Sequence, residues 1–516
     1  MTRGARLRRL DRFELGALAA LAALSLAVLA GLLIRVWTKG GIVTGSDGML
    51  VIDQLQYLNW LRQAGEHGLV GNLYQLHTGP GAVDHRSFLH PGILVSGLLH
   101  RAGLGLAASY LVWKPVAVGV LFAGALLYVG RFLDRAWDRR LALAVALFGA
   151  SPVAALAAWA GAGHQLDFDF LARELWPGNY LWGYLFTAIA VGLVPLGLLA
   201  YERGRLGWAA AAGLLAAWLQ PWQGATLALV LVAGEAVGER RLRPRRLALP
   251  LVATALPLVY YLVLSKADPA WRLADRVNDA IPRWPWWVTV LGLAPLALPA
   301  ALAYVRPGRL DFGRAALLAW PLAGLLIFYL PFGTFPFHAF QGLALPLSVL
   351  AVLGVRRRLG ERRLPALAGV AAAAILIVPG TVHLAQQMRD AVGRGNQAHY
   401  LTPGEHDALA YLDRVKEPGG VIAPDYIGTV VPAYTGRETA VGAGSWSPGF
   451  ATTRAFVDRM FAGRLSHDEV EIFVRTTKAR FLLSDCHGRA DIAPLVRGFT
   501  DPPRRFGCAT VYRVST

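Results

Sequence analysis

Apolar runs dominate the first 380 residues of the chain, and short polar stretches separate them. Many of these runs approach the roughly 20 residues that a helix needs to cross the hydrocarbon core of a bilayer. Read with a ~19-residue hydropathy window, the pattern predicts a mainly α, polytopic helical membrane protein with about eleven spans. The spans are expected at residues 15–37, 107–130, 141–159, 181–201, 206–219, 223–238, 247–265, 286–305, 315–331, 338–355 and 364–380.

Two parts of this pattern are irregular. The first run, 15–37, is longer than the ~7–15-residue apolar core of a signal peptide and no clear A-x-A site follows it, so we expect an uncleaved anchor. The fifth and sixth runs are short and are broken at "QPWQG", residues 220–224. They could be half-spans or a kinked pair, because irregular backbone at membrane depth must be protected by protein or water.

The C-terminal part of the chain has a different pattern. From about residue 396, helical stretches such as "TPGEHDALAYLDRV" alternate with short strand-like runs such as "GGVIAP" and "ARFLLSD". We therefore expect two domains, a transmembrane domain over 1–380 and an α/β domain over 396–516. The two cysteines, Cys486 and Cys508, both lie in the second domain. They form either a disulfide, if the compartment is oxidising, or two unpaired core residues.

Composition and charge agree with a membrane location. The 516 residues are 55% hydrophobic and 16% charged, with a formal net charge of +18. Most of the positive excess lies in arginine bursts between the apolar runs, near residues 3–12, 131–140, 203–205, 240–246, 306–314 and 356–363. This distribution argues against a nucleic-acid partner. It is a topology signal that predicts a cytoplasmic N-terminus and, after an odd number of spans, an extracytoplasmic C-terminal domain at the cytoplasmic (inner) membrane.

The longest loop of the membrane region, residues 38–106, falls on the predicted outer side. It carries "SDGMLVIDQLQYLNWLRQAGEHG", in which Asp53, Tyr57 and Trp60 recur near helical spacing and would share one helix face. One interpretation is an amphipathic helix whose aromatic residues anchor it at the headgroups. The other is a site for chemistry, because loops that only connect spans do not need carboxylates.

A family resemblance favours the second interpretation. The first span, the long outer loop with its Asp-x-x-x-Tyr helix, and the closing segment "FLHPGILVSGLL" resemble the GT-C glycosyltransferases, including protein O-mannosyltransferases and aminoarabinose transferases. The matching positions are Asp53, Tyr57, His90 and Pro91. Those enzymes typically carry a second acid and a second proline, where this chain has Gln54 and Gly92.

The resemblance implies transfer of a sugar from a polyprenyl-phosphate donor to a glycan, lipid or protein acceptor outside the cytoplasm. One carboxylate suffices as general base for a single inverting displacement, and Asp53 is the candidate. Tyr57, His90 and His338 are expected in the substrate pocket. Lys114, near the outer end of the second span, could bind the donor phosphate or could extend its ammonium group to lipid headgroups.

A divalent cation is a weaker expectation, and no other cofactor is indicated. "GHQLDFDF" places His164, Asp167 and Asp169 within six residues, a spacing that could hold a metal or could belong to a hydrated loop. "FGTFPFH", which ends at His338, could close the pocket or could be an aromatic belt.

Three functions are compatible with the sequence. A glycosyltransferase is favoured. A transporter or flippase for lipid-linked glycans would be expected to show ionisable residues near the membrane midplane and paired repeats, and these spans are nearly free of charge. A non-enzymatic scaffold that displays the α/β domain is disfavoured by the long first loop. In the C-terminal domain, "YTGRETAVGAGSWSPGF" lacks the spacing of a nucleotide-phosphate loop. It could recognise the acceptor, act as a lid, or be a structural cap.

Overall fold

The computed structural model describes residues 9–76, 85–305, 308, 310–330, 335–359, 366–395, 397–488 and 490–515. The described residues fall into two compact units. The first unit comprises those within Met1–Ala27, Trp113–Tyr261 and Pro282–Gln387, and the second those within Val28–Val112, Leu262–Ile281 and Met388–Thr516. The second unit thus combines the predicted first outer loop with the predicted C-terminal domain. The expected domain start at residue 396 lies outside the described residues, and the domain limits stay a prediction.

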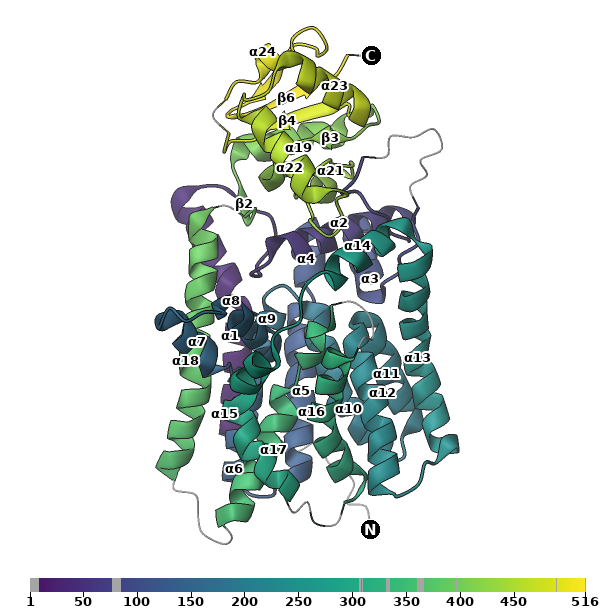
Figure 1. Ribbon diagram of the computed structural model, residues 1–516, viewed down its shortest axis with the longest axis vertical. Coiled ribbons are helices and arrows are strands. Elements are labelled where there is room, and N and C mark those ends of the chain that lie inside the picture. Colours follow the sequence, from purple (N-terminus) through teal and green to yellow (C-terminus); the bar gives the residue numbers. More distant parts are fainter. Residues whose placement is uncertain are drawn as a thin grey trace. The chain divides into compact units, whose positions relative to one another are not determined.

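Helices make up the first unit (Figure 1). Three long helices contribute to both units: α1 (Arg12–Lys39), α13 (Pro244–Ala267) and α18 (Ala366–Arg394). The others are α5 (Lys114–Phe132), α6 (Ala136–Phe148), α7 (Pro152–Trp159), α8 (Gln165–Leu175), α9 (Pro177–Leu181), α10 (Leu185–Glu202), α11 (Leu206–Leu219), α12 (Pro221–Ala233), the π-helical turn η1 (Gly234–Gly238), α15 (Trp286–Val305), α16 (Phe312–Tyr329), the 3₁₀ turn η2 (Pro336–Phe340) and α17 (Ala344–Leu359).

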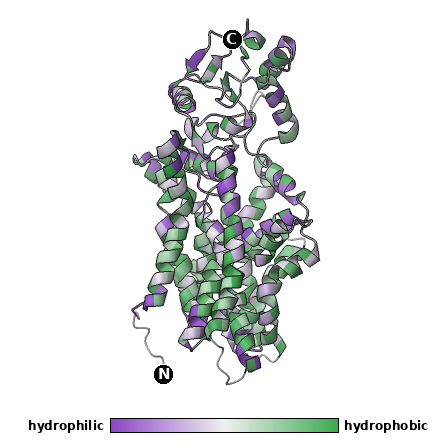
Figure 2. Ribbon diagram, turned by 90° about the vertical axis from the view of Figure 1, so that its left-hand side faces the viewer, coloured by the Kyte–Doolittle hydropathy of each residue, from purple (hydrophilic) through white to green (hydrophobic). Residues whose placement is uncertain are grey.

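The helices confirm a polytopic helical membrane protein. Among the described residues, eight helical segments are long and apolar enough to cross a membrane, and the pair α6–α7, bent by 51°, makes a ninth if it is one span. Hydrophobic residues predominate along these helices (Figure 2). Each of the eleven predicted spans overlaps with helix in the described residues, but the span predicted at 141–159 is broken between α6 and α7, and α11 and α12 are short, with 14 and 13 residues. The number of spans therefore stays a prediction.

Close helix packing and ion pairs hold the first unit together. Gly124 of α5 and Gly192 of α10 meet so closely that a Cβ at Gly124 would lie 2.4 Å from the carbonyl oxygen of Gly192. Small residues allow this approach between membrane helices. Several arginines of the predicted topology bursts are paired, as in the contacts Arg131–Glu202 at 2.6 Å and Arg356–Asp138 at 2.5 Å.

The second unit mixes helices and short strands. Its helices are α2 (Val51–His67), α3 (Pro91–Arg101), α4 (Leu106–Leu111), α14 (Pro269–Asp279), α19 (Pro403–Arg414), α20 (Asp425–Gly428), α21 (Val431–Thr435), α22 (Phe450–Phe461), α23 (His467–Thr477) and α24 (Ala493–Val496). Its strands are β1 (Ile42–Val43), β2 (Tyr400–Leu401), β3 (Val421–Ile422), β4 (Phe481–Ser484), β5 (Arg504–Phe506) and β6 (Ala509–Arg513).

A four-stranded sheet, in the order β3-β4-β6-β5, forms the centre of the C-terminal part. Strands β3 and β4 are parallel, and the other neighbours are antiparallel. Helices α22 and α23 bury Val457, Met460, Val470 and Val474 in one hydrophobic cluster with Leu482 of β4. The strand-like runs of the sequence are therefore real strands, and the α/β character of this part of the chain is present in the structure.

The loop after α1, predicted to lie on the outer side, is joined to the segment before α19 by a small antiparallel ladder. Strand β1 pairs with β2, with Ile42 opposite Leu401. The ladder continues where the Thr44 amide donates to the His399 carbonyl at 3.0 Å, and the Thr44 hydroxyl donates to the Ala398 carbonyl at 2.6 Å. These bonds connect two segments that are more than 350 residues apart in the sequence.

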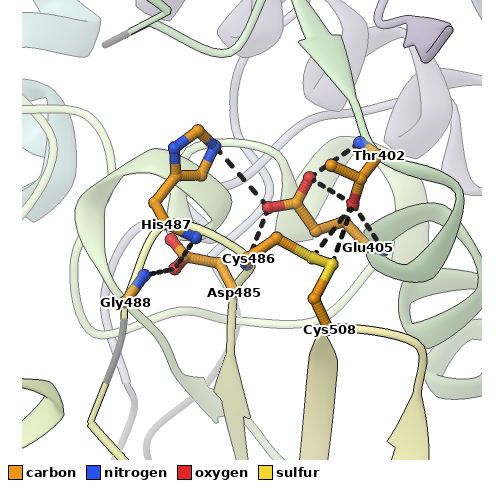
Figure 3. Close-up of a disulfide and its surroundings, with 7 residues drawn as sticks. All are labelled: Thr402, Glu405, Asp485, Cys486, His487, Gly488 and Cys508. Carbon is orange, nitrogen blue, oxygen red and sulfur yellow. Dashed lines mark hydrogen bonds and ion pairs between the residues drawn. A yellow bond between two sulfur atoms is a disulfide. The ribbon is translucent and has the colours of Figure 1, made fainter.

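Cys486 and Cys508 form a disulfide (Figure 3), as one of the two sequence interpretations predicted. The bridge links the residues that follow β4 and precede β6, two strands that pair directly. Beside it, the buried carboxylate of Glu405 accepts hydrogen bonds from the amides of Thr402, at 2.8 Å, and Cys486, at 3.0 Å. Disulfides persist in oxidising compartments, so the bridge agrees with an extracytoplasmic location.

Candidate active site

Asp53 lies in the first turn of α2 and lines a cavity. The helix begins at Val51, and its inner face buries Val51, Leu55, Leu58 and Leu61. Helix α3 packs directly against it, because a Cβ at Gly65 of α2 would lie 2.5 Å from the carbonyl oxygen of Gly97. The predicted helix around Asp53 is thus present, and its position is fixed by close packing in the second unit.

The cavity has a volume of about 770 Å³ and is partly open. This size falls within the roughly 300–1,000 Å³ usual for ligand sites. All of its walls belong to the second unit: α2, α14, the start of α20, the loop that precedes α22, and the first turns of α22. The lining residues are Ile52, Asp53, Gln56, Leu273, Val277, Asp425, Ala443, Gly444, Ser445, Trp446, Ser447, Gly449, Phe450, Ala451, Thr452 and Arg454.

A second carboxylate, Asp425, lines the same cavity. It begins α20, directly after strand β3, and its Oδ2 lies 3.3 Å from Nε of Arg454 on α22. Burial raises the pKa of the Asp425 carboxyl, and the positive charge of Arg454 opposes that rise. The cavity therefore contains two acids and one base from segments far apart in the chain.

Tyr57, one helical turn after Asp53 on α2, is a neutral phenol. Burial, together with the charge of Asp53, raises the pKa of Tyr57 well above its usual value. Its ring lies 5.8 Å from that of Trp60 and 5.9 Å from that of Tyr110. Tyr57 can donate a hydrogen bond but cannot serve as a base near neutral pH. Its predicted place in a substrate pocket stays a prediction.

An aromatic cluster adjoins the cavity at Trp446. The Trp446 ring lies 5.5 Å from Trp60 and 5.0 Å from Trp271, both in edge-on geometry. Phe88 contacts Trp60 at 4.8 Å and Trp271 at 4.6 Å. The two edge-on contacts of Trp446 are favourable arrangements of aromatic quadrupoles. The cluster fixes the position of the loop that carries Trp446.

His90 caps α3. Its Nδ1 accepts a hydrogen bond from the Ile93 amide at 3.2 Å, and Pro91 occupies the first helical position. This is a usual arrangement for a helix start, since the first amides of a helix need acceptors. His90 is not among the described residues that line the cavity, so its predicted pocket role stays a prediction.

Lys114 lies in the first unit and is buried. Its Nζ donates to the backbone carbonyls of Ser25 and Leu181, each at 2.8 Å. It therefore does not extend to lipid headgroups, which was one alternative from the sequence. These carbonyls hold the ammonium group in place, and phosphate binding by Lys114 stays a prediction.

His338 also lies in the first unit. Its Nδ1 is 3.0 Å from Glu174 Oε2 and 2.8 Å from Gln341 Nε2. The Phe335 ring contacts the His338 ring, with the ring centroids 4.7 Å apart, and Phe337 packs against Phe335. The "FGTFPFH" segment thus combines a polar pair with an aromatic cluster; its residues 332–334 lie outside the described part of the chain.

The predicted metal group is not formed. His164 Nδ1 lies 2.9 Å from Asp167 Oδ2, but Asp169 is directed to α18, where its oxygens lie 2.6 Å from His383 Nε2 and 2.6 Å from Gln387 Nε2. Within the described ranges there is no group of three His, Cys, Asp or Glu side chains placed to hold a metal ion. The side chains present at "GHQLDFDF" therefore do not fit the divalent cation.

The sequence interpretation missed Gln56, Asp425 and Arg454 as cavity residues. Gln56 could have been found, because it lies three residues after Asp53 and therefore on the same face of α2. Asp425 could have been found, because it follows the strand-like run "GGVIAP" and ligands commonly bind at the carboxyl ends of parallel strands. Arg454 had no local signal, since its place depends on how α22 packs.

Solved structures share this fold at low sequence identity. The arabinofuranosyltransferase AftD from mycobacteria aligns with a TM-score of 0.57 and 17% identity, over 99% of this chain and 42% of that one. The oligosaccharyltransferase of Archaeoglobus fulgidus aligns with a TM-score of 0.53 and 12% identity, over 95% of this chain and 73% of that one. ArnT from Cupriavidus metallidurans, bound to undecaprenyl phosphate, aligns with a TM-score of 0.50 and 12% identity, over 97% of both chains.

Sequence comparison adds nothing to these similarities: no protein-family model matches the sequence, and no match was found among curated proteins. The structural neighbours are GT-C glycosyltransferases. The GT-C resemblance expected from the sequence is therefore confirmed for the fold.

Proposed function

We propose that the chain is a membrane glycosyltransferase that moves a sugar from a polyprenyl-phosphate carrier to an extracytoplasmic acceptor. The observation that carries the proposal is the position of Asp53 on the wall of the cavity in the second unit. A carboxylate at an open cavity can accept the proton of an entering hydroxyl, whereas one on a plain surface helix has no substrate to act on.

In the proposed reaction, an acceptor oxygen attacks the anomeric carbon of the donor sugar. The bond from that carbon to the phosphate oxygen breaks, the polyprenyl phosphate leaves with the electron pair, and Asp53 takes the acceptor proton. A single displacement of this kind inverts the anomeric configuration. The phosphate leaving group gains negative charge and needs a nearby cation, for which Lys114 is the candidate from the sequence.

The likeness to other structures supports the lipid carrier. ArnT, which has a similar fold, was solved with bound undecaprenyl phosphate. A lipid donor also suits a chain with many apolar helices, since the donor can reach the protein through the bilayer. From the arginine distribution we also propose that the protein lies in the inner membrane, with the N-terminus cytoplasmic and the second unit extracytoplasmic.

The rival function is transport of a lipid-linked glycan. The first unit contains the buried ionisable pair Asp169–His383 and the pair Glu174–His338, in which His338 is partly exposed; transporters use ionisable groups of this kind. The cavity with two carboxylates and an arginine lies in the second unit and favours chemistry on a bound sugar.

Reconstituted vesicles separate the two functions. Purified protein is mixed with undecaprenyl-phosphate-linked mannose, glucose, galactose or arabinose and with a membrane extract as acceptor source, and released undecaprenyl phosphate is measured. A transferase releases the carrier from at least one donor. Movement of an intact donor between leaflets without carrier release, for every donor, would contradict the proposal.

A further inference from the structure

The cavity wall contains buried polar atoms that the protein itself does not satisfy. Gln56 is 3% exposed, and neither its Nε2 nor its Oε1 has a hydrogen-bond partner among the described residues. Ser447 is 2% exposed, and its hydroxyl likewise lacks a partner there. Both residues line the cavity. Buried polar groups are normally hydrogen-bonded, and each exception calls for an explanation.

Asp425 adds a charged acceptor to the same wall. Its Oδ2 lies beside Arg454, and its Oδ1 has no hydrogen-bond partner within the described chain. The ion pair holds the carboxylate in place and leaves the second oxygen to accept a proton donor. The half-exposed guanidinium of Arg454 also lines the cavity and brings further donors.

These groups match hydroxyls better than charges. An amide such as that of Gln56 offers a donor and an acceptor, and the Ser447 hydroxyl offers both on one atom. A sugar hydroxyl is likewise both donor and acceptor, so each can bond to either kind of group. Adjacent hydroxyls on a sugar ring fit the paired carboxylate and guanidinium of Asp425 and Arg454. A fully anionic ligand would be repelled by two carboxylates in one cavity.

The aromatic lining points the same way. Trp446 borders the cavity and is held by edge contacts with Trp60 and Trp271. A sugar ring presents a face of C–H groups that packs on an aromatic ring while its hydroxyls bond to polar side chains at the edge. Phe450, on the same wall, offers a second aromatic ring.

We propose that this cavity is the acceptor site and that the acceptor is a glycan, held by Gln56, Asp425, Arg454, Ser447 and Trp446 with one hydroxyl presented to Asp53. This inference rests on the proposed function and names its acceptor class. A peptide acceptor is disfavoured because peptides are usually recognised through sheet edges, grooves for helices or apolar side-chain pockets. This cavity also contains apolar side chains such as Leu273 and Val277, but it combines them with side-chain amide, hydroxyl, carboxylate and guanidinium groups.

Binding can be measured without any donor. Full-length protein in lipid nanodiscs is titrated with linear hexasaccharides of mannose, glucose and arabinose, and with a decapeptide that contains Ser, Thr and Asn. We expect at least one hexasaccharide to bind and the peptide not to bind. Asp425→Asn and Gln56→Leu should weaken that binding about tenfold or more, since each removes a hydrogen bond and leaves a ligand group unpaired.

Matched control variants distinguish a loss of ligand contacts from a loss of folding. Asp407→Asn removes an exposed carboxylate of α19 that does not line the cavity, and it should leave glycan binding unchanged. Trp446→Phe keeps an aromatic ring and should retain more binding than Trp446→Ala. Thermal unfolding of each variant checks the fold, and if Asp425→Asn lowers the melting temperature, Ser447→Ala provides the test in its place.

The outcomes separate this inference from the proposed function. Binding of the peptide but of no hexasaccharide, or equal glycan affinity in the wild-type, Asp425→Asn, Gln56→Leu and Ser447→Ala proteins, overturns the glycan site. Glycan binding without carrier release from any donor supports the site and counts against the transferase. Sugar transfer to the peptide alone supports the transferase and overturns the glycan acceptor.

Discussion

Asp53 of α2 and Asp425 of α20 line one cavity, although the first lies in the long loop after the first span and the second in the C-terminal part of the chain. The two carboxylates have different surroundings. Asp425 is held by Arg454 at 3.3 Å, and Asp53 lies at the start of a helix, beside the neutral phenol of Tyr57. Because of this difference, we assign acceptor binding to Asp425 and proton transfer to Asp53.

A fall in pH should destabilise the pairing between β1 and β2 through protonation of His399. This side chain is buried, and burial lowers its pKa to about 4. The unfolded chain, with a pKa near 6.5, binds a proton first as the pH falls. The neutral His399 side chain therefore makes its full contribution to the free energy of unfolding above about pH 6.5. This contribution is lost as the pH falls toward 4, and the loss is on the order of 3 kcal/mol.

Chemical denaturation at pH 7.5 and pH 5.0 measures this loss. The wild-type protein should lose more stability between the two pH values than His399→Gln, which has no titrating group at this position. His406→Gln, at an exposed histidine of α19, is the control and should behave as the wild type. Identical pH dependence in the wild-type protein and His399→Gln would contradict the prediction.

The disulfide should stabilise the C-terminal sheet. The bridge closes a loop between residues 486 and 508, a sequence separation of 22. A cross-link that closes a loop of this length stabilises the folded state by about 3 kcal/mol, because it restricts the unfolded chain. The double variant Cys486→Ser and Cys508→Ser should therefore unfold at lower denaturant concentration than the wild type. Unchanged unfolding, with mass spectrometry confirming the bridge in the wild type, would show that the sheet does not depend on it.

The contact between Gly65 and Gly97 should control the position of α2. A methyl group at residue 65 has no room, because the backbone of α3 lies 2.5 Å from the position of its Cβ. Gly65→Ala should destabilise the protein by about 1–3 kcal/mol and shift α2 away from α3. Glycan binding should weaken with it, since Gln56 lies on the same helix.

Gly105→Ala supplies the comparison for this change. Residue 105 has no atoms within 4 Å of the Cβ position, so the methyl group meets open space there. Thermal unfolding and hexasaccharide titration of the two variants should differ clearly. Equal behaviour of Gly65→Ala and Gly105→Ala would mean that close packing does not hold α2.

The periodic parts of the molecule could be predicted from the sequence. Apolar runs identify the helices because burial in lipid or protein requires a continuous apolar surface, and each predicted span overlaps with helix in the described residues. The helix at Asp53 and the strands of the C-terminal sheet also follow from local patterns. The disulfide stayed one of two alternatives, because spacing alone does not reveal which cysteines meet.

The cavity could not be predicted in the same way. Its walls come from α2, α14, α20 and α22, and no local pattern reveals that these elements meet. His164, Asp167 and Asp169 illustrate the reverse case: close spacing suggested a metal site, but the helical turn of α8 directs Asp169 to His383 of α18. Residues near one another in sequence were separated by a helix, and residues far apart were brought together by packing.

The general-base role of Asp53 is tested most directly by single-turnover transfer in reconstituted vesicles. Asp53→Asn keeps the size and shape of the side chain but cannot accept the acceptor proton. We predict a fall in the transfer rate of about 10²–10⁴-fold, with glycan binding and thermal unfolding unchanged. Asp407→Asn, at an exposed residue of α19, should transfer at the wild-type rate. A wild-type rate in a folded, glycan-binding Asp53→Asn protein would contradict the account.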